Sequence, residues 1–181
     1  MTTGLHAAPS STVQRVLTTI ALVLAIVGGV GTIAIMAMIN LDVIGRGALS
    51  MPLPATAEIV SASIVSIVFL QLPYATVSGR NVRSDMLIGR VMARSPRAAS
   101  LMEATNHLVG TIMLAVLLRY IWPEIESAVT DRETVGLFGV FTLPRWPFVV
   151  AVLAGCVMTC VVYALMTINY FRAAFLPEHH P

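Results

Sequence analysis

The sequence contains no lysine, only two cysteines and very little charge of either sign. Charged residues make up 11% of its 181 residues, whereas about 25% is usual in a soluble domain. Hydrophobic residues account for 57%, and the mean hydropathy is +0.85. One small globular core cannot bury so many apolar side chains. The composition therefore predicts a membrane protein, with lipid as the solvent for much of its surface.

The two cysteines, Cys156 and Cys160, lie four residues apart inside an apolar segment. Within one helix they are poorly placed for a disulfide, and no Cys/His set accompanies them to bind zinc. An enzyme of the membrane thiol–disulfide type would need its cysteines near a loop or helix end, and these lie about ten residues into the segment. We expect them to pack against a neighbouring helix.

Other chemical signatures are missing as well. The sequence has no nucleophile–base set, no metal-ligating cluster and no ATP-binding loop, so we expect no enzyme activity, no catalytic residue, no metal and no cofactor. Basic and aromatic residues do not interleave, which argues against nucleic acid as a partner. A haem would need axial ligands on facing spans, and His107 is the one histidine within a predicted span.

Four long apolar segments cover most of the chain. They predict membrane spans at about residues 16–41, 56–79, 98–122 and 146–171, since a spanning helix needs about 20 apolar residues. A secretory signal peptide is the alternative for the first segment, but its apolar region would have only about 7–15 residues. We therefore predict an all-α membrane protein in which residues 1–181 form a single four-helix domain.

Residues 80–97 are unusually basic. They contain five of the eleven arginines, namely Arg80, Arg83, Arg90, Arg94 and Arg97. Short loops rich in arginine stay on the cytoplasmic side of a membrane. Arg83, Arg90 and Arg94 would share one face of a helix, which predicts a short amphipathic helix at the membrane surface between spans two and three, with its arginines toward lipid phosphates or water. An irregular basic loop is the alternative.

This basic segment orients the whole chain. With four spans, both termini are expected to be cytoplasmic, and the loop at residues 123–145 is expected to be periplasmic. Its residues 123–144 are acidic, carrying Glu124, Glu126, Asp131 and Glu133 against Arg132. Trp122 and Trp146 flank it and match an aromatic belt at one membrane interface.

Two charges stand at the end of the first span, and one stands at the start of the second. Asp42 and Arg46 are four apart, so they would face the same side if the helix continues. They form either an exposed ion pair of little energetic value or, as we favour, a partly buried structural pair. Glu58 falls in the first turn of the second helix, either as a favourable helix-start charge or as a contact to Arg46 or to another subunit.

Within the third span, Glu103 and His107 are also four residues apart and close enough to pair. A proton relay would need a chain of ionisable groups across the membrane, and the sequence shows none. We therefore favour a structural hydrogen bond at His107.

From about Arg15 to Phe171, the chain resembles the small membrane (Q-type) subunit of tripartite ATP-independent periplasmic (TRAP) transporters. The resemblance rests on the four spans and on three segments, which read NLDVIGR at residues 40–46, PATAE at 54–58 and GRNVRSD at 79–85. In the family the third segment usually alternates apolar residues with its basic positions and ends in Asp. Here Ser84 replaces one apolar residue, and Asn81 stands where His is common.

The resemblance implies a role as the small permease subunit of a secondary transporter in the bacterial inner membrane. It implies two partners: a large multi-span permease subunit with substrate and sodium sites, and a periplasmic solute-binding protein. The small subunit would brace the large one and help to dock the binding protein during sodium-coupled uptake. We expect Asp42, Arg46 and Glu58 to hold the first two helices together, and Arg83 and Asp85 to fix the cytoplasmic end of the second.

A different function remains open at this point. The chain could be a self-sufficient small four-helix exporter or an accessory subunit of another membrane complex. An exporter would need a polar path through its own spans or a homo-oligomer, and the spans offer few polar groups.

Overall fold

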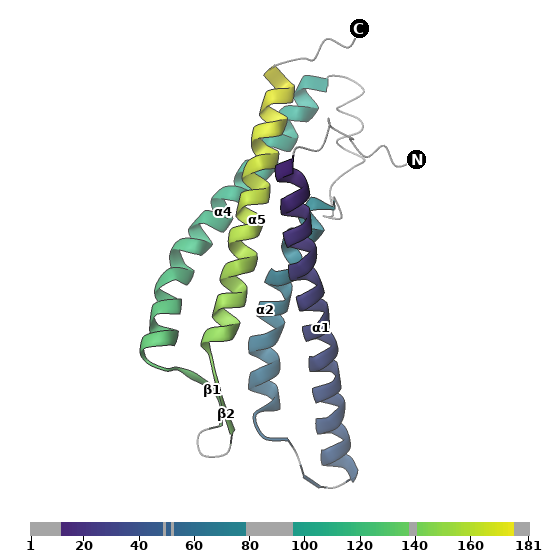
Figure 1. Ribbon diagram of the computed structural model, residues 1–181, viewed down its shortest axis with the longest axis vertical. Helices are drawn as coiled ribbons and strands as arrows, with labels where there is room; N and C mark the ends of the chain where they lie inside the picture. Colours follow the sequence, from purple (N-terminus) through teal and green to yellow (C-terminus); the bar gives the residue numbers. More distant parts are fainter. Residues whose placement is uncertain (1–11, 49, 52, 79–95, 138–140, 176–181) are drawn as a thin grey trace.

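In the residues that it describes, the computed structural model contains four long helices and one short β-hairpin (Figure 1). It describes residues 12–48, 50–51, 53–78, 96–137 and 141–175. The elements in chain order are α1 (Thr12–Ala48), α2 (Thr56–Val77), α4 (Pro96–Thr130), β1 (Thr134–Leu137), β2 (Phe141–Pro144) and α5 (Trp146–Phe175). All four helices are long and apolar enough to cross a membrane. The expected all-α membrane fold with four spanning helices is confirmed, with the hairpin as an addition to it.

The surface helix expected between the second and third spans lies almost entirely outside the described residues. The same holds for Arg80, Arg83, Asp85, Arg90 and Arg94. Arg97 lies in the first turn of α4, which begins at Pro96, where a proline is favoured because the first helical N–H has no intrahelical partner.

The four helices lie side by side in the order α1, α2, α5, α4 (Figure 1). α4 packs along α5, α5 packs along α2, and α2 packs along α1, which also touches α5 over a short stretch. The result is an open row in which α1 and α4 form the two edges. Of the 37 residues of α1, only Ala21, Gly28 and Asp42 are buried. Most of the apolar surface of α1 therefore faces lipid or another protein.

Small residues permit the close contacts within the row, as expected for membrane helices. Ala21 of α1 is fully buried against Met158 and Val162 of α5. A Cβ added at Gly155 of α5 would lie 2.1 Å from the carbonyl oxygen of Phe69 in α2. The backbones of α2 and α5 thus meet at a point where only glycine fits.

Pro73 lies inside α2, which continues to Val77 rather than ending at the proline. Proline has no N–H, so it cannot donate the usual helical hydrogen bond to the carbonyl of Phe69. This is the carbonyl that faces Gly155. The interruption of α2 therefore coincides with its closest approach to α5.

The cysteines pack against the neighbouring helix, as the sequence predicts. Cys156 is fully buried, and its Sγ lies 3.8 Å from the carbonyl oxygen of Leu114 in α4. The Sγ of Cys160 lies 4.0 Å from the carbonyl oxygen of Thr111. Both thiols are free, so they contribute packing and weak hydrogen bonds between α4 and α5.

The third helix is longer than the sequence pattern suggests. We expected it to stop at Trp122, before Pro123, but α4 continues to Thr130 with Pro123 inside it. Ala128 on this extension is buried, and Ile125 packs against the core cluster that contains Ile121, just before the extension. This apolar stripe holds the extension against the protein, and its packing outweighs the single hydrogen bond lost at the proline.

Candidate functional site

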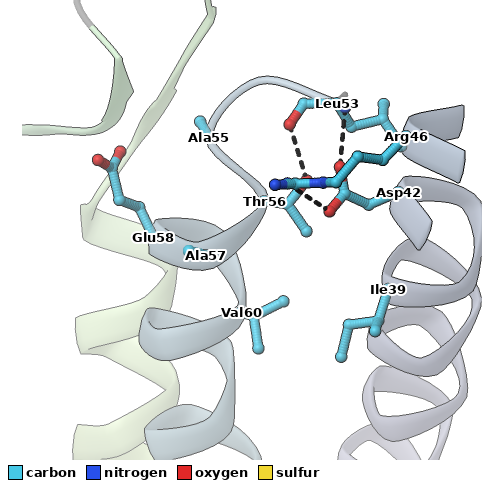
Figure 2. A pocket seen from close by; sticks show the side chains of 9 residues that line it. All are labelled: Ile39, Asp42, Arg46, Leu53, Ala55, Thr56, Ala57, Glu58 and Val60. Atoms are coloured by element: carbon cyan, nitrogen blue, oxygen red, sulfur yellow. Dashed lines mark hydrogen bonds and ion pairs between the residues drawn. The ribbon is translucent and has the colours of Figure 1, made fainter. Parts of the chain in front are cut away.

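The loop that joins α1 to α2 and the β-hairpin lie at the same end of the molecule (Figure 1). We call it the hairpin end. One polar arrangement there centres on Asp42, which is only 9% exposed. One carboxylate oxygen of Asp42 accepts a hydrogen bond from Nη2 of Arg46 at 3.0 Å, and the other accepts one from the backbone N–H of Leu53 at 2.8 Å (Figure 2). Asp42 therefore ties the end of α1 to the chain entering α2.

The rest of this loop is held by backbone contacts. The N–H of Met51 donates to the carbonyl of Gly45 at 3.0 Å, and a Cβ at Gly45 would lie 2.8 Å from the Met51 carbonyl oxygen. The hydroxyl of Thr56 donates to the carbonyl of Leu53 at 3.1 Å. Ser50 and Ala55 adopt left-handed backbone conformations, with φ of 52° and 62°. Together these features make a tight, specific connection rather than a slack linker.

Arg46 and Asp42 form the ion pair that their spacing predicts, but the two partners are in different environments. The side chain of Arg46 is 67% exposed, whereas that of Asp42 is 13% exposed. The pair is thus partly buried on its acidic side only. Arg46 gives Asp42 one of its five N–H donors, which leaves four that Asp42 does not use.

Glu58 is exposed in the first turn of α2. Its side chain points away from Arg46 (Figure 2), and no ion pair joins the two within the described part of the chain. The structure therefore brings together Asp42 and Arg46 but leaves Glu58 apart from them. Glu58 also borders a hollow of about 380 Å³ that Asp42, Arg46 and Ile39 line from the α1 side.

The two tryptophans are exposed on the outside of the helical row. Trp122 is 67% exposed on α4, eight residues before that helix ends. Trp146 is 49% exposed and is the first residue of α5. Such positions suit side chains that lie in the headgroup region, and their place in an aromatic belt stays a prediction.

Sequence reasoning missed a second polar cluster at the hairpin end. Arg145, between β2 and α5, forms ion pairs with Glu124 of α4 and with Glu133 just before β1. Its backbone N–H also donates to the carbonyl of Glu133 at 2.9 Å. The hydrogen bond from Arg145 to the Glu133 carboxylate raises the pKa of Arg145, because it favours the charged guanidinium, and the negative charge of Glu124 adds to the effect.

The hairpin explains why this cluster was missed. β1 and β2 are antiparallel, with Thr134 opposite Pro144, so Glu133 and Arg145 flank the same end of the hairpin. Our interpretation set the loop carboxylates against Arg132 alone, because it did not predict a hairpin. The sequence did contain a signal for the hairpin. Glu133 lies 12 positions before Arg145, with Gly136 and Gly139 between them.

At the opposite end, Glu103 and His107 form the pair that the sequence predicts. Nε2 of His107 lies 3.5 Å from Oε2 of Glu103, and both side chains are almost fully buried. The His107 ring stacks on Tyr170 with centroids 5.4 Å apart and lies 5.3 Å from the Tyr163 ring. The pair is thus enclosed between α4 and α5.

Within the described residues, no group of three or more His, Cys, Asp or Glu side chains could hold a metal ion. The polar clusters found here connect elements of the protein to one another. None of them has the arrangement of a nucleophile beside a base that acyl or phosphoryl chemistry requires.

Comparison with known proteins identifies the family. Residues 35–173 match the family described as tripartite ATP-independent periplasmic transporters, DctQ component. No curated protein and no solved structure matches the chain. The matched region includes the Asp42–Arg46 pair, α2, α4, the hairpin and nearly all of α5. The chain therefore belongs to the family of the DctQ component, the small permease subunit of TRAP transporters.

Proposed function

We propose that this small subunit braces a large ion-coupled permease subunit in the bacterial inner membrane and helps to dock a periplasmic solute-binding protein during solute uptake. In this proposal both termini are cytoplasmic, and the hairpin end faces the periplasm. The family assignment supports a multi-pass membrane protein of a tripartite system. The bracing and docking roles rest on the shape and chemistry of the chain.

The observation that carries the bracing role is the exposure of α1. A helix of 37 residues that buries only three of them within its own chain contributes little to an internal core. Its length of about 55 Å also exceeds the roughly 30 Å hydrocarbon thickness of a bilayer. Such a helix at the edge of an open row is suited to lie along another protein and extend its membrane-embedded scaffold.

The interior of the helical row is consistent with a brace rather than with a protein that conducts substrate itself. In the described residues, α2 and α5 approach each other closely at Gly155, and the buried Ser66 hydroxyl of α2 donates to the Phe148 carbonyl of α5 at 3.0 Å. The buried pair Glu103–His107 lies near one end of α4. A substrate pathway would need polar groups distributed along the membrane thickness.

The hairpin end supports the docking role. The ion pairs of Arg145 fix the hairpin against α4, which presents the exposed residues Phe141 and Thr142 on a held element. A preorganised surface binds a partner without a large ordering cost.

Purification of the tagged chain from its native membrane in mild detergent, followed by mass spectrometry, tests the proposal. We expect a second protein with many spanning segments to copurify in a fixed ratio. A homo-oligomer alone that moves solute into liposomes would contradict the proposal and favour a self-sufficient small transporter.

A further inference from the structure

A groove runs along the seam between α1 and α2. Next to the hollow at Asp42 and Arg46 lies a second hollow of about 330 Å³, and Ile39 lines both of them. The second hollow is lined mainly by Ile35, Met36 and Ile39 from α1 and by Ile64, Ile67 and Val68 from α2, with Thr32 at its far end. We call the two hollows together the α1–α2 groove. One end is charged, and the rest is apolar.

The apolar part of the groove runs along the helix axes. Thr32 and Ile39 are seven residues apart on α1, which corresponds to about 10 Å along the axis. Apart from Thr32, its lining side chains are apolar, and at Ile39 it adjoins the charged hollow. The groove therefore suits an occupant with an apolar chain next to a charged head.

The length of the groove fits one leaflet of a membrane. Arg46, at the charged end, and Thr32, at the apolar end, are 14 residues apart, or about 21 Å on an α-helix. A bilayer is about 40–45 Å thick with its headgroups, so one leaflet is about 20–22 Å. Arg46 would thus lie at the phosphate level when Thr32 lies near the bilayer centre.

The charges at the mouth select the kind of lipid. The Arg46 side chain is 67% exposed and uses one of its donors on Asp42, so it can bind a phosphate group. The mouth also carries the carboxylates of Asp42 and Glu58, which makes its formal charge −1. This net charge disfavours an anionic lipid and fits a headgroup that holds both a phosphate and an ammonium. Glu58 borders the same hollow from the first turn of α2 and adds negative charge on that side, while its side chain points away from Arg46 (Figure 2).

We propose that the α1–α2 groove binds one zwitterionic glycerophospholipid with an amine headgroup. Its phosphate lies on Arg46, its ammonium on the side of Glu58, and one acyl chain along Ile39, Ile64 and Val68. The lipid covers the apolar seam, of which Ile64 is 51% and Val68 55% exposed in the protein alone. This site does not depend on the bracing role, since it is formed by this chain alone.

Native mass spectrometry tests the site. The full chain, with any partners it retains, is released from nanodiscs that contain equal amounts of palmitoyl-oleoyl phosphatidylethanolamine and phosphatidylglycerol. We expect one retained phosphatidylethanolamine per chain. Arg46→Ala should lower its occupancy about tenfold, because a charge-assisted hydrogen bond is lost. Ile64→Trp should lower it similarly by filling the hollow.

Arg119→Ala and Val116→Trp serve as matched controls, because both residues are exposed on α4, away from the groove. They should leave the retained lipid unchanged. Melting temperatures recorded in the same detergent identify any variant that fails to fold. If Arg46→Ala does not fold, lipid retention by Ile64→Trp tests the proposal instead.

Three results would overturn the proposal. Phosphatidylglycerol retained as well as phosphatidylethanolamine would contradict the charge argument. Equal loss in the control variants would show that the retained lipid lies elsewhere. Efficient cross-linking of Ile64→Cys to another protein chain would show that a protein covers the groove.

Discussion

Asp42 is a buried carboxylate at the end of an otherwise apolar helix, where an unpaired charge would be costly. It is satisfied by one partner on its own helix, Arg46, and by one in the following loop, Leu53. Spacing along the sequence predicts the first partner but not the second, because a backbone N–H eleven residues away carries no sequence signal. The residue thus fixes a turn as well as forming an ion pair.

Replacement of Asp42 tests this role. Asp42→Ala leaves the Leu53 N–H without its acceptor and Arg46 without its partner, so we expect a loss of about 2 kcal/mol in the free energy of unfolding. Thermal unfolding in detergent measures the change. Asp131→Ala, at an exposed position beyond α4, is the control and should change stability by less than about 0.5 kcal/mol. Equal effects of the two substitutions would show that the loop contact at Asp42 contributes nothing.

Arg145 connects α4, the hairpin and the start of α5 through Glu124 and Glu133. Its side chain is 39% exposed, so water screens these pairs and their contribution to stability is modest. We expect Arg145→Ala to lower stability by about 1 kcal/mol and to speed amide hydrogen exchange in β1 and β2. High salt screens the ion pairs of the wild type, so the difference in stability between the wild type and Arg145→Ala should shrink there.

Arg132→Ala is the matched control for Arg145→Ala, because Arg132 is exposed and forms no ion pair with another described residue. Hairpin exchange that is as slow in Arg145→Ala as in the wild type would mean that backbone pairing alone holds the hairpin.

At the scale of elements, the contact between α2 and α5 depends on a proline and a glycine on facing helices. Pro73 leaves the Phe69 carbonyl without its usual donor, and Gly155 allows α5 to approach that carbonyl closely. Contacts between Cα–H groups and carbonyl oxygens recur at such close helix pairs. The two residues therefore act together, although they are 82 positions apart in the chain.

A methyl group added to Gly155 should disrupt this contact. Gly155→Ala places Cβ 2.1 Å from the Phe69 oxygen, so α2 and α5 must separate, and we expect a loss of about 1–3 kcal/mol. Gly29→Ala is the control, since nothing lies within 4 Å of a Cβ at that position, and alanine favours a helix by up to about 1 kcal/mol. Thermal unfolding of the two variants in the same detergent measures both effects. A Gly155→Ala protein as stable as Gly29→Ala would show that the close approach is not required.

Sequence patterns predict some of these elements better than others. The four apolar segments predict the four helices, because an apolar run of more than about 20 residues has few alternatives in a bilayer. Pro123 was a poor guide to a helix end, because α4 passes through it, whereas the predicted second span passes through Pro73 as α2 does. In both cases tertiary packing around buried residues outweighs the lost hydrogen bond.

At the scale of the whole molecule, the order of helices in the row could not be predicted. Every helix is apolar over most of its surface, so periodicity does not distinguish a face that meets a neighbour from one that meets lipid. The local pairs Asp42–Arg46 and Glu103–His107 follow from spacing on one helix. The contacts of Asp42 with the loop and of Arg145 with α4 and Glu133 do not, because they join separate elements.

The open row exposes α1, and the contacts of this helix distinguish a fixed brace from a moving part. A brace holds a fixed position against its partner while transport proceeds, whereas a moving part changes its contacts. The edge helix α1, with Val30 and Ile33 more than 60% exposed, is the surface on which the two cases differ.

The most direct test is therefore a cross-link between α1 and the large permease subunit, made during transport. Single-cysteine variants Val30→Cys and Ile33→Cys, in a chain whose Cys156 and Cys160 are replaced by alanine, are cross-linked to the copurified partner in liposomes, and solute uptake is measured before and after. We predict efficient cross-linking, with solute uptake retained within about twofold. Cleavage of the cross-link by reductant should then leave the rate of uptake unchanged. Uptake that stops on cross-linking and returns on reduction would contradict the bracing role, as would the absence of any cross-link from α1 to a partner.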